Sequence, residues 1–105
     1  MADDPPHRRA EVGYALARAA WGRGYVAEAL HAMIGFAFET LALHRLEADV
    51  DPRNERSIRA LLREGFEREG YLRERYHVSG EVQDAVLFGL LRREWSAREA
   101  EARRR

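Results

Sequence analysis

One run of apolar residues constrains the fold of this 105-residue chain more than any other feature of its sequence. Apolar side chains recur there at positions i, i+3, i+4, i+7 and onward, while Glu28, His31 and Glu39 fall off the pattern. The stripe consists of Val26, Ala29, Leu30, Met33, Ile34, Ala37, Phe38 and Leu41. This spacing is typical of an amphipathic helix packed on a core. We therefore expect a helix over about residues 25–41.

The segments on either side of this helix are expected to be strands. In residues 11–17, apolar Val12, Tyr14 and Leu16 alternate with smaller residues, which is the period of a strand. Residues 44–50 are also strand-like and end at Asp51-Pro52, where proline disfavours helix. A strand, helix and strand joined by a right-handed crossover make the two strands parallel.

The second half of the chain is expected to hold a short helix and a hairpin. Asn54 is a suitable N-cap and Gly65 a suitable C′ residue, so we expect a helix over 55–64, with Ile58, Leu61 and Leu62 on its apolar face. Strands over 67–78 and 82–91, joined at Ser79-Gly80, should pair antiparallel. The predicted class is α+β with a mixed sheet, between a disordered lead-in at 1–10 and a charged tail at 96–105.

Composition narrows the classes of function. The 18 basic and 18 acidic residues cancel, so no bulk charge indicates a nucleic-acid or membrane partner. There is no cysteine, and the histidines are scattered, so we expect no metal site. No apolar stretch is long enough to span a membrane, and the N-terminus lacks a hydrophobic signal region. We expect a cytoplasmic protein.

A glycine-rich turn leads from the first expected strand into the long helix. Gly22 and Gly24 let the backbone approach a ligand closely. The first N–H groups of a helix have no partner within it, and its dipole favours an anion there. The main-chain groups of residues 22–26, with Arg23 as an added charge, are therefore a candidate phosphate site. A tight turn that only starts the helix is the alternative.

Several segments resemble a known family. Trp21-Gly22-Arg23-Gly24-Tyr25-Val26 resembles the coenzyme A-binding motif of the GNAT superfamily of N-acetyltransferases. The run from Leu43 to Asn54, then Ser57-Ile58-Arg59 and Gly65-Phe66, resembles the branch that acetylates ribosomal-protein N-termini and its small-molecule relatives. The likeness covers about residues 11–95 and implies the C-terminal half of a GNAT fold.

The resemblance implies acetyl transfer from acetyl-coenzyme A, as co-substrate, to a primary amine. It places the cofactor along Leu16, Trp21, Gly22, Arg23, Gly24, Tyr25, Val26 and Asn54. It makes Ser57 the general acid for the departing thiolate. Tyr76 on the hairpin could act in proton transfer, and the alternative is that it is an ordinary strand residue. For the carboxylates Glu47, Asp49 and Asp51, the expected interpretation is a solvated face.

The sequence also departs from the family pattern. Trp21 and Val26 replace the usual Gln/Arg and Gly/Ala, Glu64 stands where an apolar core residue is expected, and Leu62 where a charged one is. Tyr76 occupies the hairpin position at which some relatives carry a base carboxylate, so the base stays unassigned.

Length is the largest departure, because the N-terminal half of the family fold is expected to be missing. A fragment or wrong gene start, a degraded copy, and two copies that complete each other's sheets are the three explanations. The alternative functions are accordingly an inactive coenzyme A-binding remnant, or a module that dimerises through the exposed edge of the strand at 11–17. A nucleotide-phosphate binder without acetyl chemistry is a third.

Overall fold

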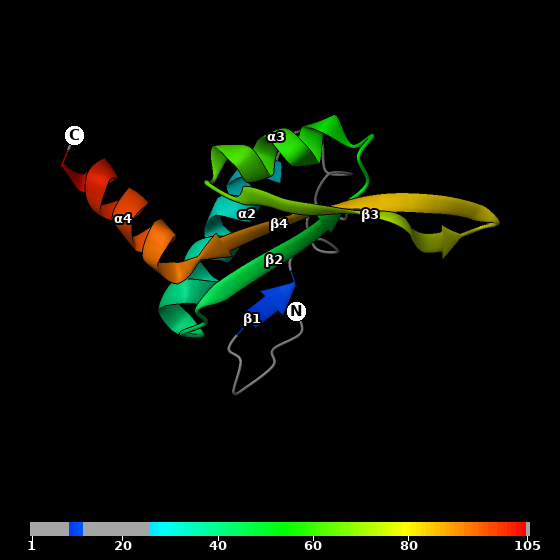
Figure 1. Cartoon of the computed structure of the whole chain (residues 1–105). Coiled ribbons are helices and arrows are strands. Elements are labelled where there is room, and N and C mark those ends of the chain that lie inside the picture. The colour runs from blue at the N-terminus through cyan, green and yellow to red at the C-terminus, as the bar shows by residue number, and fades with distance from the viewer. Residues whose placement is uncertain (1–8, 12–25, 105) are drawn as a thin grey trace.

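The structure is a computed structural model that describes residues 9–11 and 26–104. Its elements are β1 (Arg9–Glu11), α2 (Val26–Gly35) with a π-helical turn (Phe36–Thr40), β2 (Arg45–Val50), α3 (Glu55–Arg63), β3 (Glu67–Val78), β4 (Glu81–Leu91) and α4 (Arg92–Arg103). Figure 1 shows the described strands side by side, with α2 passing behind β2 and β4, and α4 leading away from the sheet. The α+β class and the predicted order of elements from the long helix to the hairpin are confirmed.

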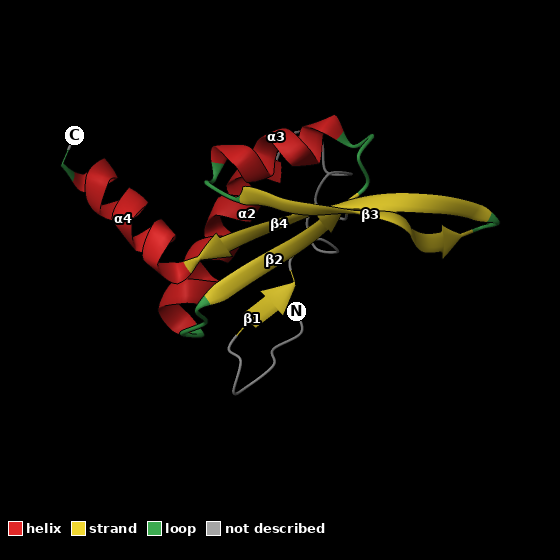
Figure 2. Ribbon diagram, viewed as in Figure 1, coloured by secondary structure: helices red, strands yellow, loops and turns green. Residues whose placement is uncertain are grey.

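The four described strands form one mixed sheet in the order β1-β2-β4-β3. β1 runs parallel to β2, with Ala10 opposite Leu46, and the other two pairings are antiparallel. The predicted parallel pair and hairpin are therefore both present, and the tip of the hairpin extends past the end of β2 (Figure 2). The described part of the first strand begins at Arg9, inside the segment expected as a lead-in, and residues 12–17 lie outside the described residues.

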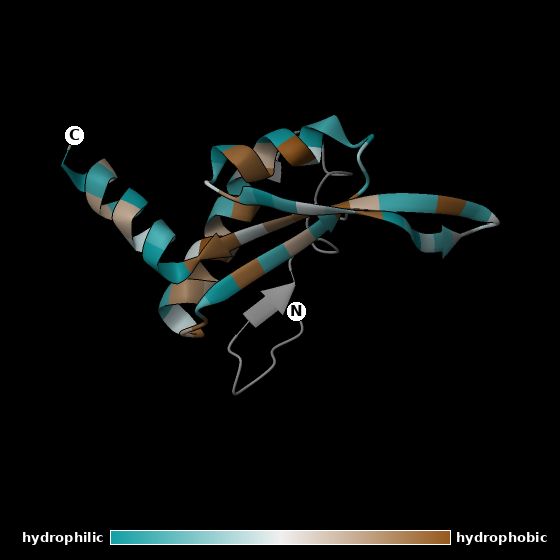
Figure 3. Ribbon diagram, in the orientation of Figure 1, coloured by the Kyte–Doolittle hydropathy of each residue, from teal (hydrophilic) through white to brown (hydrophobic). Residues whose placement is uncertain are grey.

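The two faces of this sheet differ sharply. Along β2, apolar and hydrophilic residues alternate (Figure 3), and every second side chain is buried. The buried set of β2 and β4 forms one core with α2 and α3: Leu30, Ile34, Ala37, Phe38, Leu43, Leu46, Ala48, Val50, Ala60, Leu61, Phe66, Val86, Phe88 and Leu90. We call the face of the sheet that packs on this core the covered face. We call the opposite face the open face, and there Arg45, Glu47 and Asp49 are only partly buried.

The long helix differs from its prediction at the C-terminal end. α2 is α-helical only to Gly35 and then widens into the π-helical turn, in which the Leu41 N–H bonds the Phe36 carbonyl at 3.1 Å. The extra residue in that turn carries Leu41 off the apolar stripe, and Leu41 is exposed rather than buried. Ala29 is exposed as well, because it lies roughly 100° around the helix from Leu30, at the edge of the stripe.

The short helix α3 is held at both ends by the residues that the sequence indicates. The Asn54 side chain accepts a hydrogen bond from the Ser57 N–H at 3.2 Å, which confirms the N-cap. Gly65 adopts a φ of +96°, as the C′ residue of a helix often does. Leu62 is half exposed, so its prediction as part of the apolar face is wrong. Its exposed position agrees instead with the charged residue expected there from the family pattern.

The C-terminal helix α4 packs against the helices of the core. Trp95 stacks against Phe38 with 5.3 Å between ring centroids. The Arg98 guanidinium donates from Nη2 to the Arg63 carbonyl at 2.8 Å, which satisfies an otherwise free acceptor at the end of α3. The segment expected as a charged tail therefore begins within a helix that reaches Arg103. Within the described ranges, no helix is long and apolar enough to cross a membrane.

Candidate functional site

Most of the predicted cofactor contacts lie outside the described residues. These are Leu16, Trp21, Gly22, Arg23, Gly24 and Tyr25, and their placement in a coenzyme A site stays a prediction. Val26 is the first described residue of α2, so a helix is present where the sequence predicts one, whereas the turn expected before it lies outside the described residues. The described part of the candidate site therefore rests on Asn54, Ser57 and Tyr76, all near the end of β2.

Ser57 is the most unusual polar residue of this region. Its side chain is 1% exposed, and its Oγ has no hydrogen-bond partner among the described residues. A buried polar group without a partner destabilises a fold by about 1–3 kcal/mol, so such groups are rare. Ser57 lies in the first turn of α3, where its own backbone N–H bonds the Asn54 side chain. A ligand that hydrogen-bonds this hydroxyl would remove the penalty.

Asn54 stands beside this hydroxyl at the N-terminus of the same helix. Its carboxamide oxygen is used by the Ser57 N–H, and its Nδ2 group has no partner in the described part of the chain. An amide that caps the helix through oxygen keeps its two N–H donors for an outside acceptor. Asn54 and Ser57 thus fit an elongated ligand that carries carbonyl and amide groups, as coenzyme A does.

Tyr76 lies on β3 and reaches across β4 to β2. Its hydroxyl donates to Asp49 Oδ2 at 2.8 Å, and Arg75 Nε lies 3.3 Å from the same oxygen. The Arg75 guanidinium also sits 5.7 Å from the centroid of the Tyr76 ring. Burial and the Asp49 carboxylate raise the pKa of the Tyr76 phenol, so the hydroxyl remains protonated at neutral pH.

The two predicted catalytic residues are on opposite sides of the sheet. Ser57 belongs to α3, which packs on the covered face, whereas Tyr76 bonds Asp49 on the open face. Both lie toward the carboxyl end of β2, from which the chain continues through Asp51 to Asn54.

Asp49 is the site residue that the sequence reading missed. It alternates with buried Ala48 and Val50, so a solvated position was the natural interpretation. The signal that would identify it is its partner Tyr76, but the two are far apart in sequence. Their meeting depends on an irregularity in β3 that no local pattern reveals.

That irregularity is a bulge in the hairpin. Leu72 pairs with Ala85 and Tyr76 with Gln83, so three residues of β3 face Asp84 alone. Asp84 stabilises the bulge by accepting the Tyr71 hydroxyl at 2.5 Å and the Glu74 N–H at 2.7 Å. Glu74 has a φ of +53°, an unusual value for a residue with a side chain. The bulge thereby sets where Tyr76 lies along β4.

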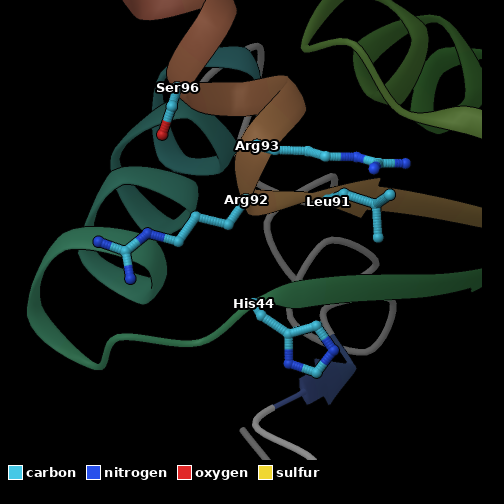
Figure 4. Close-up of a pocket in the computed structure, with 5 residues that line it drawn as sticks. All are labelled: His44, Leu91, Arg92, Arg93 and Ser96. Atoms are coloured by element: carbon cyan, nitrogen blue, oxygen red, sulfur yellow. The ribbon is translucent and has the colours of Figure 1, made fainter.

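A separate cavity of about 590 Å³ lies at the other end of β2. It is lined by His44, Leu91, Arg92, Arg93 and Ser96, where β4 leads into α4 (Figure 4). His44 precedes the first residue of β2, whereas Asp49 is near its last. Among the described residues, this cavity contains none of the predicted site, because Asn54, Ser57 and Tyr76 are not in its lining.

Comparisons with known proteins agree with this geometry. The family model described as an acetyltransferase (GNAT) domain matches residues 1–67. An uncharacterized N-acetyltransferase of Bacillus licheniformis is 41% identical over 93 residues, which is 89% of this chain and 52% of that protein. The ribosomal protein uS5-alanine N-acetyltransferase of Escherichia coli is 36% identical over 81% of this chain and 44% of that protein.

Solved structures show the same relationship. An acetyltransferase of the GNAT family from Bacillus anthracis is 31% identical, with a TM-score of 0.64 over 70% of this chain and 45% of that one. A chimera of the spermidine N-acetyltransferase of Vibrio cholerae has a TM-score of 0.77 over 91% of this chain and 58% of that one, and at 23% identity it shows the fold alone. The chain spans about half the length of the curated relatives it matches. Because the family model covers well over half of the sequence, the chain belongs to the GNAT family of acetyltransferase domains.

Proposed function

We propose that this chain binds acetyl-coenzyme A and takes part in transferring its acetyl group to a primary amine. The observation that carries the proposal is the buried Ser57 hydroxyl, which has no hydrogen-bond partner among the described residues and lies at a helix N-terminus beside Asn54, whose oxygen caps that helix. When bound, acetyl-coenzyme A supplies the acetyl group as a thioester. Its amide-rich arm suits donors and acceptors of this kind.

The proposed cofactor site extends from Asn54 to the start of α2. The backbone N–H groups of Gly22, Arg23, Gly24, Tyr25 and Val26 would bind the pyrophosphate, with Leu16 and Trp21 beside the cofactor. A helix N-terminus favours an anion through its free N–H groups and its dipole, and α2 provides one at Val26. The chain has no net charge, so local donors of this kind must provide the attraction.

Ser57 and Tyr76 would divide the proton chemistry between them. Ser57, on the covered face, would direct its hydroxyl proton toward the departing sulfur. Tyr76, on the open face, would act in proton transfer with the amine. Relatives named for their acceptor include the uS5-alanine N-acetyltransferase and the spermidine N(1)-acetyltransferase of Escherichia coli. Both acceptors present primary amines, which supports this substrate class.

A second candidate is a coenzyme A-binding module without activity of its own. The observation that favours it is the extent of the match, since the chain spans about half of its relatives. In this case the edge of β1 would pair with a second copy, in the cytoplasm, to give a dimer. Acetylation of an amine by the purified 105-residue protein would exclude this candidate.

The melting temperature with and without millimolar acetyl-coenzyme A tests the cofactor site. A ligand at a hundredfold excess over its Kd stabilises the folded state by about 2.7 kcal/mol, which raises the melting temperature by several degrees. Gly24→Val should abolish the rise because a side chain there blocks the phosphate. Gly35→Val is the matched control, since a Cβ at Gly35 meets nothing within 4 Å. No rise for the unaltered protein, or an unchanged rise for Gly24→Val, would contradict the site.

A further inference from the structure

The direction of one hydrogen bond limits what Tyr76 can do. A phenol carries a single proton, and Tyr76 directs it to Asp49 Oδ2 at 2.8 Å. While that bond exists, the hydroxyl cannot donate to a second group. Its oxygen can still accept a hydrogen bond. The geometry therefore makes Tyr76 an acceptor toward whatever approaches it.

The open face is the side from which an acceptor could approach. The core contacts of α2 and α3 occupy the covered face, and Ser57 is buried among them. Tyr76 is 42% exposed on the other side, at the same end of β2. An amine that arrives from the open face meets Tyr76 before it meets any residue of α3.

A second tyrosine–aspartate pair lies at the bulge of the hairpin. Tyr71 donates to Asp84, and Asp84 also binds the Glu74 N–H, so this pair stabilises the bulge. Asp84 lies two residues before buried Val86 on β4, so both side chains are on the same face of the sheet, the covered one. Asp49 joins β2 to Tyr76 and to Arg75, the last residue of the bulge.

We propose that Asp49 is a positioning residue that makes Tyr76 the proton acceptor for the amine. This inference rests on the proposed function of the chain. The substrate in its ammonium form gives a proton to Tyr76 Oη as the Tyr76 hydroxyl proton passes to Asp49 Oδ2. The nitrogen keeps the electron pair of the broken N–H bond and becomes a neutral amine, Tyr76 remains neutral, and the Asp49 carboxylate becomes a carboxylic acid. The base that the sequence leaves unassigned is thus a pair of residues rather than one carboxylate.

The charged neighbours of the pair are consistent with this role. Arg75 contributes a cation from β3, beside both Tyr76 and Asp49, and Glu47 lies two residues before Asp49 on the same face. Burial and Asp49 raise the pKa of Tyr76, while Arg75 lowers it. Tyr76 alone would therefore be a neutral phenol with little basicity. The Tyr76 oxygen can take a proton from the substrate only if the Tyr76 hydroxyl proton moves to Asp49.

Kinetics of acetyl transfer to n-butylamine separate positioning from simple structural support. Asp49→Asn and Tyr76→Phe should each lower kcat by about 100-fold or more, within the range of general acid–base catalysis, and leave the KM for acetyl-coenzyme A unchanged. Asp49→Glu should recover part of the rate. Glu47→Gln is the matched control and should keep wild-type kcat. An equal loss in this control, or wild-type kcat in Asp49→Asn, would overturn the proposal.

A second measurement does not depend on turnover. In protein labelled with ¹³Cζ-tyrosine, the Tyr76 signal is identified as the one missing from Tyr76→Phe. Addition of n-butylamine near pH 10, where the ammonium form and the neutral amine are both present, should shift this signal in the wild type and in Glu47→Gln, but not in Asp49→Asn. A wild-type signal that does not move would contradict the inference.

The two measurements also separate this inference from the proposed function. A melting temperature raised by acetyl-coenzyme A, together with a Tyr76 signal that ignores the amine, would leave the function standing and overturn the role of Asp49. An amine-sensitive Tyr76 signal in a protein that does not bind acetyl-coenzyme A would support the amine contact and overturn the proposed function.

Discussion

Arg45 and Glu69 form a bidentate ion pair that crosses the open face of β4 directly above Gly89. Arg45 Nη1 lies 3.2 Å from Glu69 Oε2, and Nη2 bonds the other carboxylate oxygen. Arg45 Nε also donates to Glu47 at 2.9 Å. A Cβ at position 89 would lie 2.5 Å from Glu69 Oε2, so the pair needs the space that glycine leaves.

Gly89→Ala should break this pair at a modest loss of stability. The added methyl displaces the end of a flexible side chain, and exposed or half-exposed ion pairs contribute at most about 1 kcal/mol. Urea unfolding should show a loss of that size. Gly35→Ala, whose methyl meets nothing within 4 Å, should instead gain about 0.5–1 kcal/mol. A stabilised Gly89→Ala protein would contradict the pairing.

The same ion pair predicts acid sensitivity. The hydrogen bond from Arg45 lowers the pKa of Glu69. The ion pair therefore stabilises the folded state fully above the ordinary glutamate pKa, and this stabilisation is lost as pH falls through the lowered pKa. The stability difference between wild type and Glu69→Gln should therefore shrink on acidification below about pH 4. Urea midpoints at pH 7 and pH 3 test this. A difference that persists at pH 3 would be inconsistent with an ionic contribution.

His31 and Glu64 should give the opposite dependence on pH. His31 Nδ1 lies 2.9 Å from Glu64 Oε1, joining α2 to the end of α3, and this bond raises the pKa of His31 above its ordinary value of 6.5. A raised histidine pKa adds stability that is complete below pH 6.5 and lost as pH rises through the raised value. His31 is well exposed, so the gain is below about 1 kcal/mol. Melting temperatures of wild type and His31→Gln should differ at pH 5.5 and converge at pH 9.

Gly65→Ala should loosen the contact between α3 and α4. Gly65 has a φ of +96°, and a Cβ there would lie 2.8 Å from Arg98 Cδ. Backbone strain of this kind destabilises by about 1–3 kcal/mol. The double variant with Arg98→Ala separates the two causes, because the clash disappears and the strain remains. If the double variant is no more stable than the sum of the single losses predicts, Arg98 does not pack on Gly65.

Asn54 variants separate helix capping from cofactor binding. Asn54→Ala removes the cap and should reduce stability by about 1 kcal/mol. Asn54→Ser keeps a capping oxygen but loses Nδ2, so its melting temperature without ligand should stay near the wild-type value. Its rise with acetyl-coenzyme A should be smaller. A full rise in Asn54→Ser would show that Nδ2 does not contact the cofactor.

The sequence predicts elements whose signals are local and misses relationships that depend on strand register. The bounds of α3 follow from Asn54 and Gly65, which act within a few residues of the helix they end. The end of α2 could not be predicted, because a π-helical turn has no period that distinguishes it from the preceding stripe.

The candidate site divides in the same way. Ser57 is found through a motif, but its missing hydrogen-bond partner depends on tertiary packing. Asp49 and Tyr76 are 27 residues apart and meet only because three residues of β3 face one residue of β4. The alternation of buried and exposed residues along β2 places Asp49 on the open face. It does not indicate that Tyr76 of β3 extends across β4 to bond Asp49.

The bulge around Asp84 also restricts how this hairpin can change in length. Between Leu72 and Tyr76, β3 takes four steps while β4 takes two, so the excess is even and both strands keep their faces. Loss of a single residue from 73–75 would turn Tyr76 to the covered face, away from Asp49, because side chains alternate along a strand. Loss of two would restore its orientation. Insertions and deletions that preserve the pairing of Tyr76 with Asp49 should therefore come in pairs.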